Sequence, residues 1–480
     1  MKTIKNFFSE INANNIPYCH FKSNDHIYEA FIARSDFDIL VARDYYSQFS
    51  MICLQNNLKK VQAQKELSYP GVVDWIGYDE VSKFQFHLHV HFVLVTGKQH
   101  VKEFNIPWVK YFLENRYLDP EFELYCPEKD LEYVLFLSRI SLKLNYYEII
   151  KLWFGRARIK ESTKHEFLKI IDGIDINKFV SRNLLDLSDS ELQFFISFIK
   201  KREICKKDIK KINTIVRRKL KYYSNEKKGI LFFKSVYRFF SYRLKQKIKV
   251  HFPLTVLTKK VPVTSGLVVL FIGADGAGKT TISNDIYKWL KWKYDAERIY
   301  LGSGNNKILS RLGSFLKKSL NQNRKRIAKQ LFTLEEKGTT HILQRLFYAY
   351  HSAYILKMIK KIYKYRNQGG IAILDRYPQM QYFGINDGCK IPKKYKVLGA
   401  LERKNLGKAC RYQPDIVFKL SITKETALSR KPDHDENMIE RKIEIINTLL
   451  FPDSKEINIS SEINYTDEIE IIKKTIWQNL

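Results

Sequence analysis

The chain has 480 residues, of which 45% are hydrophobic and 14% aromatic, enough to fill the cores of two or three domains and to exclude a disordered polypeptide. Lysine and arginine outnumber aspartate and glutamate by 83 to 51, giving a net charge of +32, so anionic partners or a lysine-rich solvated surface are expected. Six separated cysteines without a CxxC pair predict a reducing, cytoplasmic location, and no apolar run reaches the roughly 18 residues that a membrane-spanning helix needs.

The first segment, residues 1–125, mixes short β-like runs with helical stretches and predicts an α+β domain. Asp36 and Asp38 alternate along the run "DFDILV", so both carboxylates face the same side of a short strand. Two such carboxylates can hold divalent metals against the phosphates of a nucleotide. Both residues are therefore candidate metal ligands.

The same segment resembles the DNA-polymerase-β-like nucleotidyltransferase superfamily, because Ser23 precedes Asp36 with a helical segment between them. The resemblance implies a third carboxylate on a later strand, and its candidate position in "FQFHLHVHFVLV" is His89, with His87 and His91 on the same face. These histidines could bind zinc or another transition metal, or pack as neutral imidazoles. Active nucleotidyl transfer, a degenerate nucleotide- or partner-binding domain, and a metal-dependent activity of another type all stay open.

Residues 126–220 form a predicted helical domain, since "DLEYVLFLSRISLKLNYYEIIKLWF" carries apolar residues at three- and four-residue spacing. Arg139 and Lys143 are four residues apart on one face of this pattern. They are either two surface cations or a pair that contacts a triphosphate.

Residues 221–262 form a basic connector that contains an amphipathic pattern over 229–252. Its apolar face carries Phe233, Val236, Phe240 and Leu244. The lysines and arginines elsewhere around it are Lys234, Arg238, Lys245 and Lys249. A helix of this kind either lies on a membrane surface or packs its aromatic stripe on a neighbouring domain.

From residue 263 to 480, β-like runs alternate with helical ones, which predicts a parallel α/β sheet. The stretch "GADGAGKT" satisfies G-x-x-x-x-G-K-[ST], with a strand before it and a helix after it. Its backbone N–H groups are expected to surround a phosphate, with Lys279 on the β- and γ-phosphates and the Thr280 hydroxyl on Mg²⁺. The predicted ATP-binding residues are Gly273, Ala274, Asp275, Gly276, Ala277, Gly278, Lys279, Thr280 and Thr281.

A second motif, "GGIAILDRYP", reads as a buried strand over Ile371–Leu374 that ends in three polar residues. Ligands bind at the carboxyl ends of strands in open α/β sheets. Asp375 is therefore predicted to hold Mg²⁺ or the acceptor oxygen, and Arg376 and Tyr377 to bind the acceptor.

A third motif, "SRKPDHDENMIERK", has the composition of a hinged lid that carries cations over a transferring phosphoryl group. Its cations are Arg430, Lys431, Arg441 and Lys442, and its carboxylates are Asp433, Asp435 and Glu436.

These three motifs, in this order, resemble the thymidylate kinase family over residues 263–480. The resemblance implies a P-loop kinase with a five-stranded parallel sheet, ATP·Mg²⁺ as the phosphoryl donor, and catalytic roles for Lys279, Asp375 and, from the lid, Arg430. The arginine-glutamate-proline-glycine segment that shapes the acceptor pocket in this family is missing from "IYLGSGNNKILSRLGS". Gly302, Ser303, Gly304 and Arg311 are other candidate phosphate contacts in that stretch.

The sequence therefore predicts an ATP-dependent phosphotransferase whose acceptor is a nucleoside monophosphate or a similar phosphorylated small molecule. Two alternatives are a kinase acting on a sugar or glycan in surface polysaccharide synthesis and a non-catalytic, nucleotide-gated binding protein. No feature indicates a specific nucleic acid or an oligomeric state.

Overall fold

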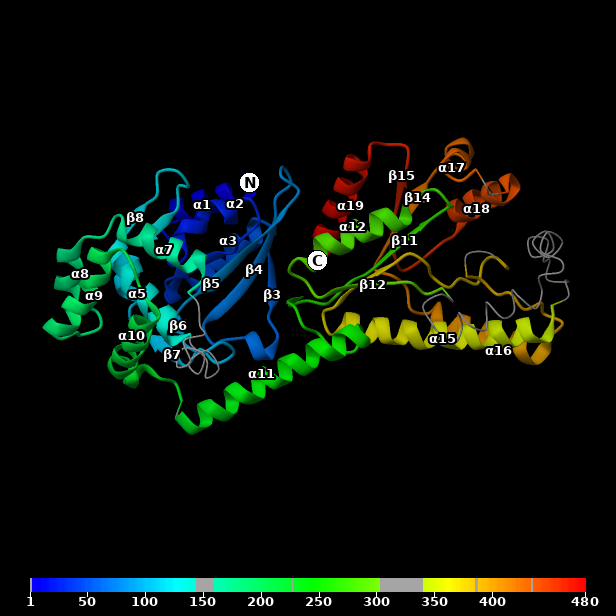
Figure 1. Cartoon of the computed structure of the whole chain (residues 1–480). Coiled ribbons are helices and arrows are strands. Elements are labelled where there is room, and N and C mark those ends of the chain that lie inside the picture. The colour runs from blue at the N-terminus through cyan, green and yellow to red at the C-terminus, as the bar shows by residue number, and fades with distance from the viewer. Residues whose placement is uncertain (1, 144–158, 227, 303–339, 385–386, 433–434) are drawn as a thin grey trace. The chain divides into compact units, whose positions relative to one another are not determined.

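The computed structural model of the chain describes residues 2–143, 159–226, 228–302, 340–384, 387–432 and 435–480. The chain divides into two compact units, Met1–Gln246 and Lys247–Leu480, which we call unit 1 and unit 2 (Figure 1). The finer segmentation at residues 125, 220 and 262 stays a prediction.

The N-terminal part of unit 1 is built on a mixed sheet, with both parallel and antiparallel strand pairs. Its strands are β1 Tyr18–His20, β2 Phe37–Val41, β3 Lys59–Gln62, β4 Val72–Tyr78 and β5 Gln85–His91. They lie in the order β1-β2-β5-β4-β3. β2 and β5 run parallel, whereas the β1–β2, β5–β4 and β4–β3 pairs are antiparallel. Two small antiparallel pairs follow, β6 Leu94–Thr96 with β7 Phe104–Ile106 and β8 Arg116–Leu118 with β9 Tyr125–Pro127.

Short helices complete this α+β part of unit 1. They are α1 Lys2–Ala13, α2 Ile27–Phe31, α3 Tyr46–Gln55 and α4 Val109–Glu114, with 3₁₀ turns at Asn24–His26, Arg43–Tyr45 and Lys65–Leu67. α1 buries Ile4, Phe7, Phe8 and Ile11, which recur on one face at helical spacing. These side chains share a core with the strand residues Phe37 and Trp75. The α+β character of the segment is thus confirmed, while its likeness to nucleotidyltransferases stays a prediction.

The rest of unit 1 is helical. Its helices are α5 Lys129–Leu142, α7 Glu161–Ile171, α8 Ile176–Arg182, α9 Asp189–Lys201 and α10 Lys206–Lys219, followed by a 3₁₀ turn at Lys221–Tyr223. α5 is buried over most of its length. Its Tyr133 hydroxyl donates a hydrogen bond of 2.7 Å to the Phe195 carbonyl on α9, which ties the two helices together.

The 24-residue helix α11, Lys228–His251, contains the boundary between the two units. Among the described residues, no helix combines the length and the apolar character that crossing a bilayer requires, including α11.

Unit 2 contains a parallel sheet of five strands among its described residues, as the sequence predicts. The strands are β11 Val268–Gly273, β12 Ala296–Ile299, β13 Ile371–Leu374, β14 Ile416–Ser421 and β15 Lys455–Ser460, in the order β12-β13-β11-β14-β15. All four residues of β13 are buried, which is typical of a strand covered on both faces. A short strand, β10 Val261–Pro262, precedes the sheet.

Helices cover both faces of this sheet. They are α12 Lys279–Lys291, α15 Ile342–Asn367, α16 Lys396–Ala409, α17 Lys424–Arg430, α18 Glu436–Thr448 and α19 Tyr465–Asn479. α12 and α19 lie on one face, and α15 and α16 lie on the other (Figure 1). β11 is central, with β13 on one side and β14 on the other, so the loops after β11 and β13 leave the same edge of the sheet.

Candidate functional site

The predicted phosphate-binding loop lies between β11 and α12, where its backbone geometry depends on glycine. Gly276 and Gly278 have φ of 92° and 78°, in the left-handed region that favours glycine. A Cβ on Gly273 would lie 2.9 Å from the carbonyl oxygen of Leu420, so a side chain has no room there. Gly278 is also the residue before α12, so the loop leads directly into a helix N-terminus, where backbone N–H groups favour anions.

The Lys279 amine is held inside this loop. Its Nζ donates hydrogen bonds of 2.9 and 2.7 Å to the carbonyl oxygens of Gly273 and Ala274. Burial is the largest cause that lowers the pKa of Lys279, and the Asp275 carboxylate opposes that shift. Thr280 and Thr281, the next residues of α12, are exposed. Lysine and hydroxyl groups are thus placed at the start of α12, and their contacts with phosphates and Mg²⁺ stay a prediction.

Two cations of the predicted lid reach the loop from separate helices. Arg430, the last residue of α17, donates 3.0 Å from Nη1 to the Gly276 carbonyl and 3.2 Å from Nη2 to the Ser461 carbonyl. Lys442 on α18 forms a 2.5 Å ion pair with Asp275 of the loop. The structure therefore brings Arg430 to the backbone of the loop and Lys442 to its carboxylate. Asp433 of the lid lies outside the described residues.

Asp375 follows β13 at the same edge of the sheet. It is 8% exposed, and its Oδ2 accepts a 3.2 Å hydrogen bond from Nη2 of Arg298 on β12. Its Oδ1 is buried and has no hydrogen-bond partner among the described residues. After the larger effect of burial, the charges of Arg376 and Asp375 also act on the pKa of Lys279, Arg376 lowering it and Asp375 raising it. Sequence reasoning missed Arg298, because only the pairing of β12 with β13 places it beside Asp375.

Arg376 and Tyr377 differ in how the protein uses them. The Arg376 guanidinium is 3.6 Å from the Asp387 carboxylate and 5.1 Å from the centre of the Tyr300 ring. Tyr377 is buried, and its hydroxyl donates a hydrogen bond to the Tyr412 carbonyl. Burial raises the pKa of Tyr377 well above its usual value. The phenol thus joins the motif to the core, and its contact with an acceptor stays a prediction. Of the other acceptor-side candidates, Ser303, Gly304 and Arg311 lie outside the described residues.

The metal candidates of unit 1 come together across three strands. Asp38 on β2 and Asp74 on β4 are each paired in register with His89 on β5. Asp74 Oδ1 lies 2.7 Å from His89 Nδ1 and 2.8 Å from His87 Nε2. Burial acts to raise the pKa of Asp74, but these two contacts outweigh it and hold that pKa well below its usual range. Asp36 lies 3.0 Å from His87 Nδ1. Sequence reasoning missed Asp74, because only the strand register places it beside the histidines.

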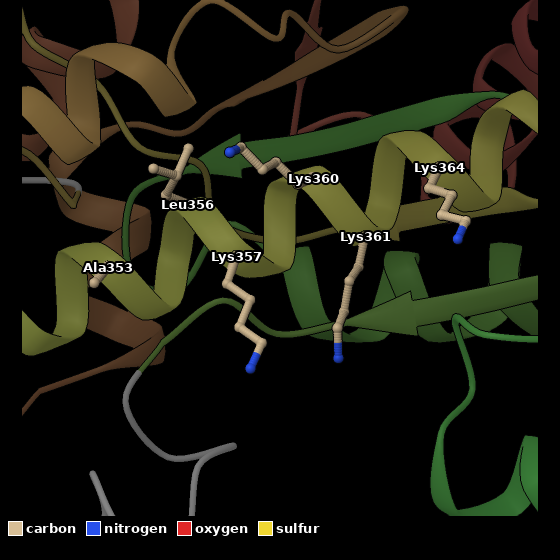
Figure 2. A pocket seen from close by; sticks show the side chains of 6 residues that line it. All are labelled: Ala353, Leu356, Lys357, Lys360, Lys361 and Lys364. Atoms are coloured by element: carbon tan, nitrogen blue, oxygen red, sulfur yellow. The ribbon is translucent and has the colours of Figure 1, made fainter.

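A separate hollow of about 400 Å³ lies along α15. Figure 2 shows its lining side chains, four of which are lysines from successive turns of the helix. They are Ala353, Leu356, Lys357, Lys360, Lys361 and Lys364. None of the predicted ATP-binding residues lines it, so it is distinct from the loop site.

Part of the chain is similar to known proteins. No protein-family model matches the chain. The uncharacterized ATP-binding protein YghR of Escherichia coli K12 is 29% identical over 225 residues, 44% of this chain and 86% of YghR. The uncharacterized ATP-binding protein YghS of the same strain is 26% identical over 215 residues, 42% of this chain and 88% of YghS.

Two solved structures are also similar to part of the chain. Thymidylate kinase from Candida albicans covers 45% of this chain and 91% of its own, with 17% identity and a TM-score of 0.28. Deoxyadenosine kinase from M. mycoides, solved with bound dATP, covers 44% of this chain and 99% of its own, with 19% identity and a TM-score of 0.26.

Proposed function

We propose that unit 2 is an ATP-dependent phosphotransferase whose acceptor is a nucleoside monophosphate or a similar phosphorylated small molecule. The observation that carries this proposal is the contact of Arg430 with the Gly276 carbonyl, which puts a lid arginine on the phosphate-binding loop. A loop that only binds nucleotide has no need of such a cation, whereas phosphoryl transfer spreads negative charge onto oxygens that an arginine can stabilise. The relatives YghR and YghS, which are named as ATP-binding proteins, support the donor.

The residues present fit ATP and Mg²⁺. The loop has no room for a Cβ at Gly273 and needs left-handed backbone at Gly276 and Gly278, as a backbone cradle for phosphates requires. Mg²⁺ prefers oxygen ligands, and the exposed Thr280 hydroxyl and the unpartnered Asp375 Oδ1 are suitable donors. When bound, the ion would neutralise charge on the phosphates and orient them.

The protein's own groups would then act as follows. The Lys279 amine exchanges its contacts with the Gly273 and Ala274 carbonyls for contacts with β- and γ-phosphate oxygens, because charged acceptors bind an ammonium more strongly than neutral carbonyls. Arg430 turns from the Gly276 carbonyl toward the transferring group, and the lid excludes water as it closes. Arg376 holds the acceptor phosphate in a bidentate fork, and Asp375 would help to hold Mg²⁺ through Oδ1.

An acceptor screen with isotopically labelled ATP tests the proposal. Purified protein is incubated with nucleoside monophosphates, sugars and glycans, and labelled products are separated by chromatography. We expect transfer to a phosphorylated acceptor, its abolition in Lys279→Ala, and its retention in Lys288→Ala, whose exposed lysine lies on the same helix. Transfer that survives Lys279→Ala would refute the proposed mechanism.

The same screen separates the alternatives. Transfer to a sugar or glycan without a phosphate would favour a role in surface polysaccharide synthesis. Tight ATP binding with no transfer to any acceptor would favour a nucleotide-gated binding protein.

A further inference from the structure

The strand β5 of unit 1 presents a buried imidazole that lacks a partner. His87, His89 and His91 alternate along β5, so their rings share one face of the sheet. His91 is 1% exposed, yet neither of its ring nitrogens has a hydrogen-bond partner among the described residues. A buried polar group without a partner costs free energy, so a ligand for this ring would stabilise the arrangement.

Asp38 and His89 lie beside His91 in a geometry that suits a metal ion. One ligand atom from each of Asp38, His89 and His91 lies within 4.8 Å of the other two. The His89 and His91 rings are 4.6 Å apart between centroids and nearly perpendicular, at 82°. Two imidazoles and one carboxylate are the protein ligands that hold Zn²⁺ or Fe²⁺ and leave coordination positions open.

Asp74 and His87 orient these ligands without binding the metal themselves. Asp74 Oδ1 lies 2.7 Å from His89 Nδ1, so this nitrogen carries the proton and Nε2 keeps its lone pair for a metal. His87 places its Nε2 2.8 Å from Asp74 and its Nδ1 3.0 Å from Asp36. Both nitrogens of His87 therefore face carboxylates, which makes it a supporting residue rather than a ligand.

We propose that Asp38, His89 and His91 bind one transition-metal ion of the Zn²⁺ or Fe²⁺ class, with Asp74 as the carboxylate that positions His89. We call these four residues together with His87 the histidine cluster. This assignment moves Asp36 from the ligand set to a contact of His87, keeps His91 from the three histidines that the sequence offers, and adds Asp74, which the sequence does not place there. It is independent of the activity proposed for unit 2.

Cations around the cluster indicate the class of ligand that the open metal positions would take. Lys22 lies 2.8 Å from Asp38 Oδ1, which leaves a metal to bind Oδ2. Burial is the largest cause that lowers the pKa of Lys102 to about 7, and Lys22 and Arg139 add to it, whereas Arg139 is the largest cause that lowers the pKa of Lys143 to about 7, followed by burial and Lys22. The contact of Lys22 with Asp38, together with these further cations, matches a phosphate-bearing anion.

The test uses the full chain, freed of metal with a chelator and of any purification tag, and titrated with Co²⁺ as a spectroscopic probe and with Zn²⁺ by calorimetry. We expect one equivalent of metal and visible Co²⁺ absorption of a nitrogen- and oxygen-ligated site. We expect the bound metal and the Co²⁺ absorption to be lost both in His91→Phe and in Asp38→Asn. Two separate variants are used because a folding defect in His91→Phe alone would also abolish binding. His26→Ala, which alters a histidine outside the cluster, keeps both signals.

The result that overturns the proposal is either no Co²⁺ absorption in the wild type or equal binding in folded His91→Phe and Asp38→Asn. The ligand class is tested by adding inorganic phosphate to the Co²⁺ form of the Lys279→Ala variant, in which the loop of unit 2 is disabled. A shift of the Co²⁺ spectrum that is lost in Arg139→Ala supports a phosphate-bearing ligand, and an unchanged spectrum contradicts it.

A second, independent observation concerns the surface of α11. Five apolar side chains on this helix are exposed at alternating spacings of three and four residues, with Phe233 and Tyr237 exposed by 74% and 72%. The set, which we call the α11 stripe, is Ile230, Phe233, Tyr237, Phe240 and Leu244. The sequence placed Val236 on this face, but it is half-buried in the structure.

We infer that the α11 stripe binds an anionic membrane surface. α11 contains lysines and arginines but no aspartate or glutamate, and the exposed cation Arg243 lies directly beside Leu244 of the stripe. A second copy of the stripe would set these cations against each other, whereas anionic headgroups complement them. Phenylalanine and tyrosine also suit the boundary between headgroups and acyl chains.

Co-sedimentation with vesicles tests this inference. We expect the full chain to sediment with phosphatidylcholine vesicles that contain phosphatidylserine, less so at high salt, and not with phosphatidylcholine alone. The double variant Phe233→Ser/Phe240→Ser should lose binding, and Phe84→Ser, an exposed phenylalanine elsewhere in unit 1, should keep it. Equal sedimentation of the double variant, or a dimer in ultracentrifugation that the double variant abolishes, would overturn it.

Discussion

The phosphate-binding loop of unit 2 and the histidine cluster of unit 1 assemble their polar groups by different means. The loop takes consecutive residues between β11 and α12 and uses backbone geometry, with left-handed φ at Gly276 and Gly278. The cluster takes side chains from β2, β4 and β5, which only strand register brings together. A site built from backbone groups depends on its glycines and on the cations that contact the loop. A site built from side chains depends on each metal ligand and on Asp74, the carboxylate that positions His89.

The largest effect is expected from Arg430→Ala. If Arg430 stabilises charge only in the transition state, kcat falls by about 10³-fold while the Kd for ATP changes little. Steady-state kinetics with the acceptor found in the screen, together with equilibrium ATP binding, measure the two quantities. Arg411→Ala, an exposed arginine outside the site, is the matched control. A parallel loss of ATP affinity would instead make Arg430 a ground-state contact of the loop.

In the histidine cluster, Asp74→Asn tests a residue that supports a ligand without being one. The amide can still contact His89 but no longer favours the proton on Nδ1, so Zn²⁺ affinity is expected to fall by about 10–100-fold. Calorimetry on the full chain measures this change, and ATP binding by unit 2 serves as the internal control. Unchanged Zn²⁺ affinity would remove Asp74 from the site, and complete loss would make it a ligand.

The difference between the loop and the histidine cluster also explains which of their residues the sequence could predict. Local sequence patterns predict the loop, Asp375 after β13 and the cations of the predicted lid. A motif between a strand and a helix indicates which elements surround it. The five-stranded parallel sheet came with the family resemblance and is confirmed by the strand order. The contact between Arg430 and Gly276 joins residues far apart in sequence, and it required the fold.

Register explains most of what the sequence missed. Asp74 lies outside every motif, and its place opposite His89 depends on how β4 pairs with β5. Arg298 likewise depends on the pairing of β12 with β13. Asp36 and Asp38 were predicted as equivalent, yet Asp38 faces the metal candidates and Asp36 faces His87. One-dimensional spacing identifies which residues share a face of a strand, but not which strand is the neighbour.

His351 of unit 2 provides a contrast to His91, because it is a buried histidine outside any metal-competent group of the described residues. Burial lowers the pKa of His351 to about 4, below the ordinary value of about 6.5. The folded state thus favours the neutral ring, and the stabilisation that this ring provides is present above pH 6.5 and lost as the pH falls toward 4.

We expect this loss to reach at most about 3 kcal/mol. Denaturant titrations at pH 7 and pH 4.5 on the wild type and His351→Phe isolate the contribution as a double difference, with His251→Gln as the exposed control. Phenylalanine keeps an aromatic ring beside Phe347 and cannot be protonated. An equal loss of stability in His351→Phe would assign the acid sensitivity to other groups.

The smallest effects separate two kinds of glycine in unit 2. A Cβ on Gly407 in helix α16 meets no atom within 4 Å, so Gly407→Ala should raise the free energy of unfolding by about 0.5–1 kcal/mol, through the lower entropy of the unfolded chain. Gly276→Ala should lower it by about 1–2 kcal/mol, because φ of 92° is strained for an L-residue whatever the space around it. Denaturant unfolding measures both changes, and ATP titration measures their effect on the loop. If the loop depends on backbone geometry as proposed, only Gly276→Ala weakens ATP binding, although the two substitutions add the same methyl group.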